Sequence, residues 1–327
     1  MFRSLPHKTN QFFYALIKLS IVFGAAYFIY NKVYLNDNLD FSVFRQFLIE
    51  NHVFSTKNVL FLCFLSIFNW FFEILKWKNL VDFLQEISFH QALKESLSSL
   101  TASLFTPNRL GDYAAKILYY PSKLRKRIIF LNLMGNMAQM TITVVFGLIG
   151  LTLFQAKYDL EVSSFKVVRM ATLLLIISFL TFVSVRQSKL KIRGFWFHKI
   201  VSFFKTIPRS VQFKNLGFSL IRYLIFSYQF YFLLGIFGVD VFYINAMVVI
   251  SSMYILASII PSIFIFDSII KGSVAIYLFG LVGVNELTIL SIIAIMWILN
   301  FALPSIIGSY FVLRFNPSNS LKRPLQE

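Results

Sequence analysis

The sequence predicts an all-α, polytopic transmembrane helix bundle. Hydrophobic residues make up 57% of the 327 positions and charged residues only 14%, whereas a soluble domain carries about a quarter charged residues. Apolar stretches recur that reach or approach the roughly 20 residues a helix needs to cross a bilayer. The short alternating segments typical of a membrane β-barrel do not occur in the sequence. Because no long polar region separates the apolar stretches, we expect one integral membrane domain over residues 1–327.

Six stretches are clear candidate spans: Phe12–Tyr34, Val59–Leu75, Ile128–Phe154, Val167–Val185, Leu216–Phe237 and Leu287–Leu313. Two further apolar regions, about 92–120 and 244–282, contain a proline followed by charged residues and predict broken or re-entrant helices. We expect the first to be a hairpin that enters from the cytoplasm. The second is either a hairpin from the other side or two complete spans.

Basic residues are concentrated in a few loops. Residues 121–127 carry four Lys or Arg and residues 186–215 carry eight, with no acidic residue in either segment, whereas the loops 31–56 and 155–166 mix both signs. Loops rich in Lys and Arg remain in the cytoplasm. The chain is therefore predicted to be multi-pass, with both termini cytoplasmic.

The net charge of +17 does not predict nucleic-acid binding, because the charge lies in loops beside spans. It is first a topology signal, and clustered Lys and Arg also attract anionic lipid headgroups at the cytoplasmic face. Within the loop 186–215, residues 195–207 are amphipathic and predict an interfacial helix. A protein partner, if there is one, is expected at this loop.

The two broken regions share a short pattern. Proline, aspartate and then lysine four residues later occur in each, as Pro107, Asp112 and Lys116 and as Pro261, Asp267 and Lys271. The flanking spans run in opposite senses around the two regions. Such inverted repeats with broken helices are common in secondary transporters and flippases. We predict a first repeat over about 57–155 and a second over about 216–314.

Ionisable residues within membrane segments are costly and are candidate functional residues. Those of the broken regions are Arg109, Asp112, Lys116, Asp267 and Lys271. Arg109 lies at the predicted tip of the first break, between Pro107 and Gly111, where a planar guanidinium beside unpaired backbone N–H groups suits a phosphate. The Asp–Lys pairs equally fit helix ion pairs that only lower the cost of insertion.

The span Ile128–Phe154 carries a polar stripe. Asn132, Asn136, Gln139 and Thr143 share one helical face, which fits either hydrogen bonds between helices or the lining of a groove for a headgroup. Glu73 and Lys76 lie beside Trp70 and Trp77, a grouping we interpret as an interfacial anchor. The four histidines lack ligand spacing, and no nucleophile or glycine-loop motif occurs. We therefore predict no catalytic residue, metal or cofactor.

One stretch resembles a known family. Residues 98–112 contain a Thr-Pro-x-Arg-x-Gly-acid pattern, made of Thr106, Pro107, Arg109, Gly111 and Asp112. It resembles the transmembrane region of lysylphosphatidylglycerol synthases and the stand-alone flippase-like proteins built on that region. The family's second, glycine-rich proline motif is reduced here to Pro261 and a displaced Asp267.

The resemblance implies a protein of the bacterial inner membrane that binds or translocates a lipid or lipid-linked substrate. It implies no synthesis of that lipid, because a soluble aminoacyltransferase domain has no room in the chain. Two other functions remain open on the sequence. One is a non-transporting membrane anchor for a lipid-modifying or glycosyl-transfer partner, and the other is a small-solute secondary transporter.

Overall fold

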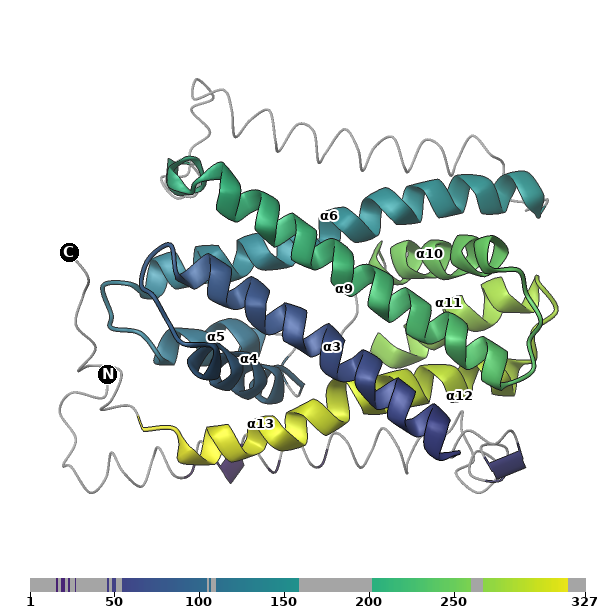
Figure 1. Cartoon of the computed structure of the whole chain (residues 1–327), viewed down its shortest axis with the longest axis horizontal. Helices are drawn as coiled ribbons and strands as arrows, with labels where there is room; N and C mark the ends of the chain where they lie inside the picture. The colour runs from purple at the N-terminus through teal and green to yellow at the C-terminus, as the bar shows by residue number, and fades with distance from the viewer. Residues whose placement is uncertain are drawn as a thin grey trace.

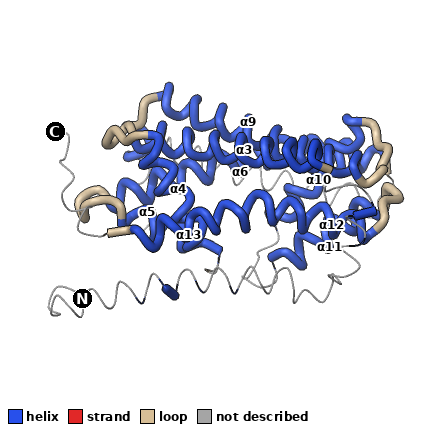
Figure 2. The backbone as a smooth tube through the Cα atoms, turned by 60° about the horizontal axis from the view of Figure 1, so that its bottom comes forward, coloured by secondary structure: helices blue, strands red, loops and turns tan. Residues whose placement is uncertain are grey.

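The computed structural model describes residues 55–104, 106, 110–158, 202–259 and 267–316, with a few isolated positions between 16 and 50; of Ile259 and residues 267–271 it describes the backbone alone. All secondary structure in these residues is helical, which confirms the predicted class (Figure 2). The predicted spans Phe12–Tyr34 and Val167–Val185 lie almost entirely outside the described residues. Of the predicted interfacial helix over residues 195–207, the structure describes residues 202–207, and residues 202–206 are helical.

The first half of the described chain contains four helices. The helix α3 spans Thr56–Val81, α4 spans Phe89–Leu104, α5 spans Leu110–Leu118, and α6 spans Arg125–Lys157. Of these, α3 and α6 are long and apolar enough to cross a membrane, as predicted. The hairpin arms α4 and α5 have 16 and 9 residues, fewer than the roughly 20 needed for a full span.

The second half follows the same order. It consists of α9 (Arg209–Ile236), α10 (Tyr243–Ile259), α11 (Asp267–Gly280), α12 (Glu286–Trp297), a π-helical turn η2 (Ile298–Ala302) and α13 (Leu303–Arg314). The helix α9 and the composite helix from α12 to α13 are long apolar spans. The described parts of α10 and α11 have 17 and 14 residues and pack against each other as a helical hairpin. Whether this hairpin is re-entrant or consists of two complete spans stays a prediction, because residues 260–266 lie outside the described residues.

The two halves pack as an inverted pair. In Figure 1, α4 and α5 lie at one end of the bundle, and α10 and α11 lie at the opposite end. The long helices α3 and α9 pack against each other, α4 packs on α13, and α10 packs on α6. Likewise α5 packs on α6 as α11 packs on α12. Each hairpin thus packs on the last helix of the other half, as expected for an inverted repeat. The boundaries of the two repeats, at about 57–155 and 216–314, stay a prediction.

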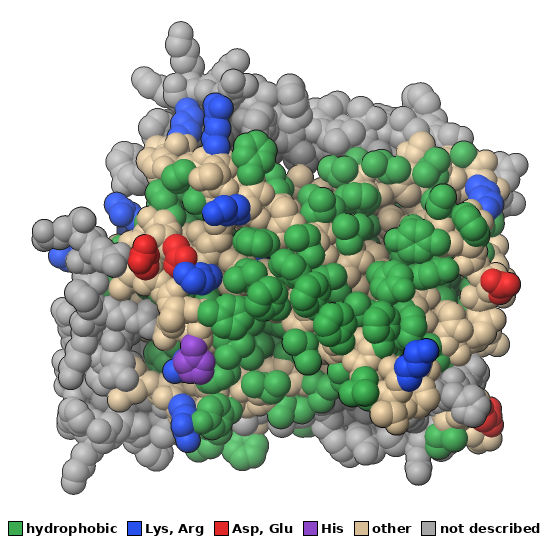
Figure 3. All heavy atoms as spheres, in the orientation of Figure 1, with side chains coloured by type: hydrophobic (Ala, Val, Ile, Leu, Met, Phe, Trp, Pro, Cys, Tyr) green, Lys and Arg blue, Asp and Glu red, His purple; other side chains and the backbone are tan. Residues whose placement is uncertain are grey.

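The surface matches a lipid environment. Large apolar side chains such as Leu60, Ile67 and Ile149 are more than half exposed. Hydrophobic side chains cover the middle of the face drawn in Figure 3, and most of the charged ones that it shows gather toward its two ends. A soluble protein rarely exposes an apolar patch of this extent, so the chain is an integral membrane protein.

Candidate functional site

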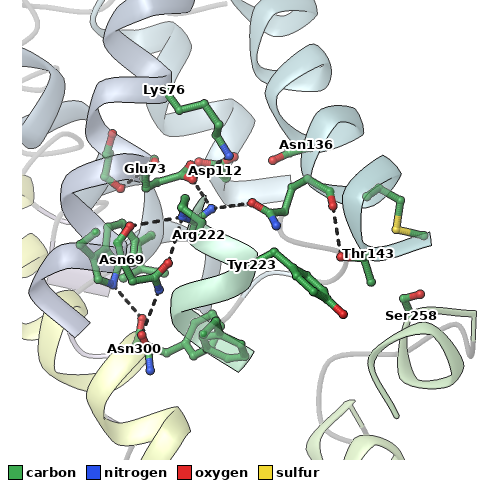
Figure 4. A pocket seen from close by; sticks show the side chains of 18 of the residues that line it. Asn69, Glu73, Lys76, Asp112, Asn136, Thr143, Arg222, Tyr223, Ser258 and Asn300 are labelled. Carbon is green, nitrogen blue, oxygen red and sulfur yellow. Dashed lines mark hydrogen bonds and ion pairs between the residues drawn. The ribbon is translucent and has the colours of Figure 1, made fainter. Parts of the chain in front are cut away.

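A cavity of about 490 Å³, with charged and polar side chains among its lining residues, lies where the two halves meet. It is lined from the first half by α3, α4, α5 and α6 and from the second half by α9, α10 and η2. Five of its lining residues are acidic or basic: Glu73, Lys76, Asp112, Lys116 and Arg222. Figure 4 shows four of them gathered at one end of the cavity, with Ser258 at the other end.

Glu73 is at the centre of the charged end. Its Oε2 accepts from the Nζ of Lys76 at 2.7 Å and also pairs with the guanidinium of Arg222 on α9. The Lys76 side chain is only 3% exposed, and Trp77 is buried as well. The interpretation of this group as an interfacial anchor is therefore wrong. Glu73 points into the bundle, where the guanidinium of Arg222 on α9 pairs with its carboxylate, and that carboxylate in turn holds Lys76.

Asp112 and Lys116 form a second ion pair across one turn of α5, with 3.1 Å between Oδ1 and Nζ. The buried Asn132 of α6 joins both of them. Its Nδ2 donates to Asp112 at 2.7 Å, and its Oδ1 accepts from Lys116 at 2.7 Å. The Lys116 ammonium also lies 4.3 Å from the ring centre of Trp77. The predicted pair therefore exists, and it is bonded to a second helix.

The polar stripe of α6 is shared between packing and cavity. Asn136 and Gln139 line the cavity and Asn132 does not. Asn136 donates to the Tyr113 hydroxyl of α5 at 2.8 Å. Gln139 accepts from Arg222 at 3.2 Å while its Nε2 donates to the backbone of α9. Both interpretations of the stripe thus have support, because the same amides join helices and face the cavity.

Thr106 and Gly111 of the Thr-Pro-x-Arg-x-Gly-acid stretch join the two arms of the first hairpin. Thr106 Oγ1 accepts from the backbone N–H of Gly111 at 2.8 Å. A Cβ at Gly111 would lie 2.0 Å from the carbonyl oxygen of Ala102 on the other arm. The threonine and the glycine therefore bring the two arms together, and Asp112 lies in the first turn of α5 beside the cavity.

Comparison with known protein families shows to which family the chain belongs. The family pattern described as "Lysylphosphatidylglycerol synthase TM region" matches residues 15–308. The chain belongs to this family. No match was found among curated proteins or among solved structures.

In this member of the lysylphosphatidylglycerol synthase TM family, Arg222 is the functional candidate that the sequence argument missed. It lies near the middle of α9, inside a predicted span, and a lone arginine at membrane depth is by itself a sign of function. Its Nε donates to Asn69 Oδ1 at 3.2 Å. Counting charged residues within the spans, and not only within the breaks, would have found it.

Glu95 was also missed, and it has a structural place in this family member. Fully buried on α4, it accepts from Trp77 Nε1 at 2.8 Å, from the Tyr120 hydroxyl at 2.6 Å and from Gln91 Nε2 at 2.7 Å. A buried carboxylate is tolerated when several donors satisfy it. Because Trp77 lies under Lys116, Glu95 helps to position the wall of the cavity.

The far end of the cavity is uncharged among its described lining residues. Tyr223, Phe226, Tyr254 and Ser258 line it, and the Tyr223 hydroxyl is 3.0 Å from Ser251 Oγ. On the α4 wall, the Oγ of Ser96 is buried without a hydrogen-bond partner among the described residues.

Several predicted residues cannot be placed at the cavity. Arg109, Pro107 and Pro261 lie outside the described residues, and Asp267 and Lys271 belong to α11 with no described side chain. Within the described parts of the chain, no group of three or more His, Cys, Asp or Glu side chains is arranged to hold a metal ion.

Proposed function

We propose that this protein binds an amphipathic lipid or lipid-linked substrate, with the headgroup in the central cavity, and moves it between leaflets. The observation that carries the proposal is a charged cavity lined by both halves of an inverted repeat. Transporters built from such repeats bind substrate at the midplane, where the repeats meet. Membership of the lysylphosphatidylglycerol synthase TM family supports a lipid over other substrates.

The size of the cavity supports a headgroup as its occupant. Small-molecule sites measure about 300–1,000 Å³, and the 490 Å³ here falls in the lower half of that range. Such a volume holds a headgroup but not two acyl chains. The chains of the substrate would therefore remain in the lipid beside the bundle while the headgroup crosses.

The charged end of the cavity supports an anionic group, such as a phosphodiester, as the part that is recognised. Arg222, Lys76 and Lys116 face Glu73 and Asp112, and the planar guanidinium of arginine pairs with phosphate oxygens as well as with carboxylates. A phosphate would replace Glu73 as a partner of Arg222. Arg109 remains a second candidate contact, and we propose no chemical step.

We further propose that the protein lies in the inner membrane with the end that carries the first hairpin in the cytoplasm. The described ends of the helices support this orientation. Arg127, Arg209 and Arg314 lie at that end with most of the other described basic residues, whereas the opposite end carries Asp240 and Glu286 beside Lys57 and Lys157. Basic residues mark the cytoplasmic side, where they would also attract anionic lipids.

A leaflet-exchange assay tests the proposal. The purified protein is reconstituted into sealed vesicles that contain fluorescent phosphatidylglycerol, and dithionite bleaches the label in the outer leaflet. Wild type is expected to expose inner-leaflet label faster than empty vesicles. The Arg222→Gln variant is expected to lose about tenfold or more of the rate, because charge-assisted hydrogen bonds contribute roughly 1.5–3 kcal/mol each.

The matched control is Arg209→Gln, which removes the same charge from the exposed start of the same helix. It is expected to retain the wild-type rate. Equal rates in the two variants would remove Arg222 from substrate binding. Wild-type vesicles no faster than empty ones would overturn translocation and favour an anchoring role, which co-purification of a partner through the loop 186–215 would then test.

A further inference from the structure

The last span is interrupted at the cavity. Between α12 and α13, the turn Ile298–Ala302 is π-helical, and the N–H of Leu303 donates to the carbonyl of Ile298 five residues earlier. Pro304 follows directly and has no N–H to donate to the carbonyl of Asn300. The indole of Trp70 donates to that carbonyl instead, at 3.0 Å. Such π-turns within α-helices occur frequently at functional sites.

The two arms of this span belong to different parts of the bundle. The arm α13 is in close contact with α4 of the first hairpin. A Cβ at Gly308 would lie 2.2 Å from the Leu97 carbonyl oxygen, and Thr101 donates to the Ser305 carbonyl at 2.8 Å. The arm α12 packs on α11 and α9 of the second half. A change of bend at η2 therefore moves one hairpin relative to the other.

The corresponding helix of the first half has no such break. The helix α6 is continuous over 33 residues and packs on both hairpins, through α5 and α10. A Cβ at Gly147 would lie 2.4 Å from the Ile255 side chain, and one at Gly150 would lie 2.7 Å from that of Ser251. The two hairpins are thus joined by a continuous helix on one side and by an interrupted helix on the other.

A chain of hydrogen bonds joins the π-turn to the charged end of the cavity. Arg222 Nε donates to Asn69 Oδ1 at 3.2 Å, and Asn69 Nδ2 donates to Asn300 Oδ1 at 3.0 Å. Asn300 Nδ2 in turn donates to Gln229 Oε1 at 2.9 Å. Asn69 and Asn300 are both buried, so water does not readily replace these bonds. Figure 4 shows Asn300, Asn69 and Arg222 in this order.

We propose that η2 is a hinge between the two hairpins and that the chain Arg222–Asn69–Asn300 is a latch that holds its bend. A ligand that draws the Arg222 guanidinium toward itself breaks the first bond of the latch and frees the hinge. The identity of that ligand, an anionic headgroup, rests on the proposed function. The hinge and the latch are inferred only from the π-turn and from the hydrogen bonds described above.

The expected movement is large enough to measure. Each arm has 12 residues and is about 18 Å long at 1.5 Å per residue. A change of about 20° in the bend, the size of an ordinary helix kink, displaces the end of an arm by about 6 Å. The same change at a continuous helix would require the loss of several backbone hydrogen bonds.

Distances between spin labels test the hinge in the full chain without any added ligand. In a Cys63→Ser background, one pair of labels is placed by Glu286→Cys and Leu313→Cys, at exposed positions on the two arms. The control pair, Lys126→Cys and Leu153→Cys, occupies exposed positions near the two ends of α6. Both pairs are measured by pulsed electron paramagnetic resonance in phosphatidylcholine nanodiscs.

Two substitutions open the latch at different bonds. Asn69→Ala removes the middle residue, and Arg222→Gln removes the cation, so the result does not depend on one variant folding. Each is expected to broaden the distance distribution of the last-span pair and to shift its mean by about 1–3 Å, the change that a difference of about 20° in bend makes between the outer ends of two arms of about 18 Å. The α6 pair is expected to stay unchanged. Unchanged distributions in both variants, or equal broadening of both pairs, would overturn the proposal. Lipid exchange is measured separately, so its failure would not be mistaken for failure of the hinge.

Discussion

Replacing Glu73 by glutamine tests whether the charges of the cavity are energetically coupled. The Glu73 carboxylate pairs with both Lys76 and Arg222, and the three side chains are 17%, 3% and 19% exposed. Glutamine keeps the shape of the side chain and removes its charge. Two cations would then face each other in a poorly solvated site, with Lys116 nearby.

The magnitude follows from burial. Removing one partner of a buried ion pair costs about 3–5 kcal/mol, because a charge remains desolvated and uncompensated. The partial exposure of Glu73 places the expected loss near the lower end, at about 3 kcal/mol. The assay is unfolding of the purified protein in mixed micelles with sodium dodecyl sulfate, followed by the fluorescence of its four tryptophans.

The control is the same chemical change on the neighbouring pair of Lys78 and Asp82. These side chains lie 2.5 Å apart but are 31% and 30% exposed, and exposed pairs contribute about 0–1 kcal/mol. Asp82→Asn is therefore expected to cost less than about 1 kcal/mol. The asparagine also keeps an oxygen for the N–H of Ile87, which Asp82 accepts at 2.9 Å.

A second substitution tests whether uncompensated positive charge causes the loss of stability in Glu73→Gln. Adding Lys76→Met to Glu73→Gln removes one of the uncompensated cations at similar volume, so the double variant is expected to recover part of the lost stability. A loss of stability in Glu73→Gln no larger than that in Asp82→Asn would show that the charges of the cavity are not coupled. So would a further loss of stability when Lys76→Met is added to the Glu73→Gln protein.

Two other predictions concern glycines and use the same unfolding assay. Gly111→Ala is expected to cost about 3 kcal/mol or more, because the added methyl would overlap the Ala102 carbonyl of the opposite hairpin arm; a loss below about 1 kcal/mol would show that the arms separate easily. Gly308→Ala is expected to destabilise through its contact with Leu97, whereas Gly217→Ala, with open space around it, is expected to be neutral or to stabilise by up to about 1 kcal/mol. Equal effects at the last two positions would mean that close packing of α13 on α4 is unimportant.

The lengths of the apolar stretches and a few short motifs predicted much of the described fold. Four of the six predicted spans fall among the described residues, and all four are long apolar helices. The break after Phe105 was predicted from Pro107 and Gly111. The described contacts of Gly111 give a further reason for that glycine, because the opposite arm comes too close for a side chain. Such features depend on a few consecutive residues, so they can be read without knowing the neighbours of a helix.

The candidate site was predicted in part for the same reason. Asp112, Lys116 and the amides of α6 were selected because ionisable and polar side chains are costly in a membrane. Helical spacing placed Asn132, Asn136 and Gln139 on one face. It did not tell which of them would face the cavity, because that depends on how α5 and α9 pack against α6.

The membrane class, the long spans, the broken regions and the basic end of the molecule could therefore be predicted without a structure. These follow from the hydrophobicity, charge and turn chemistry of neighbouring residues. Only the tertiary structure decided that Glu73 lies inside the bundle, that Arg222 pairs with it, and that Asn300 joins the last span to both through Asn69. Those partners are 149 and 231 residues apart in the chain. Their meeting depends on two half-chains packing in opposite orientations, which no local pattern encodes.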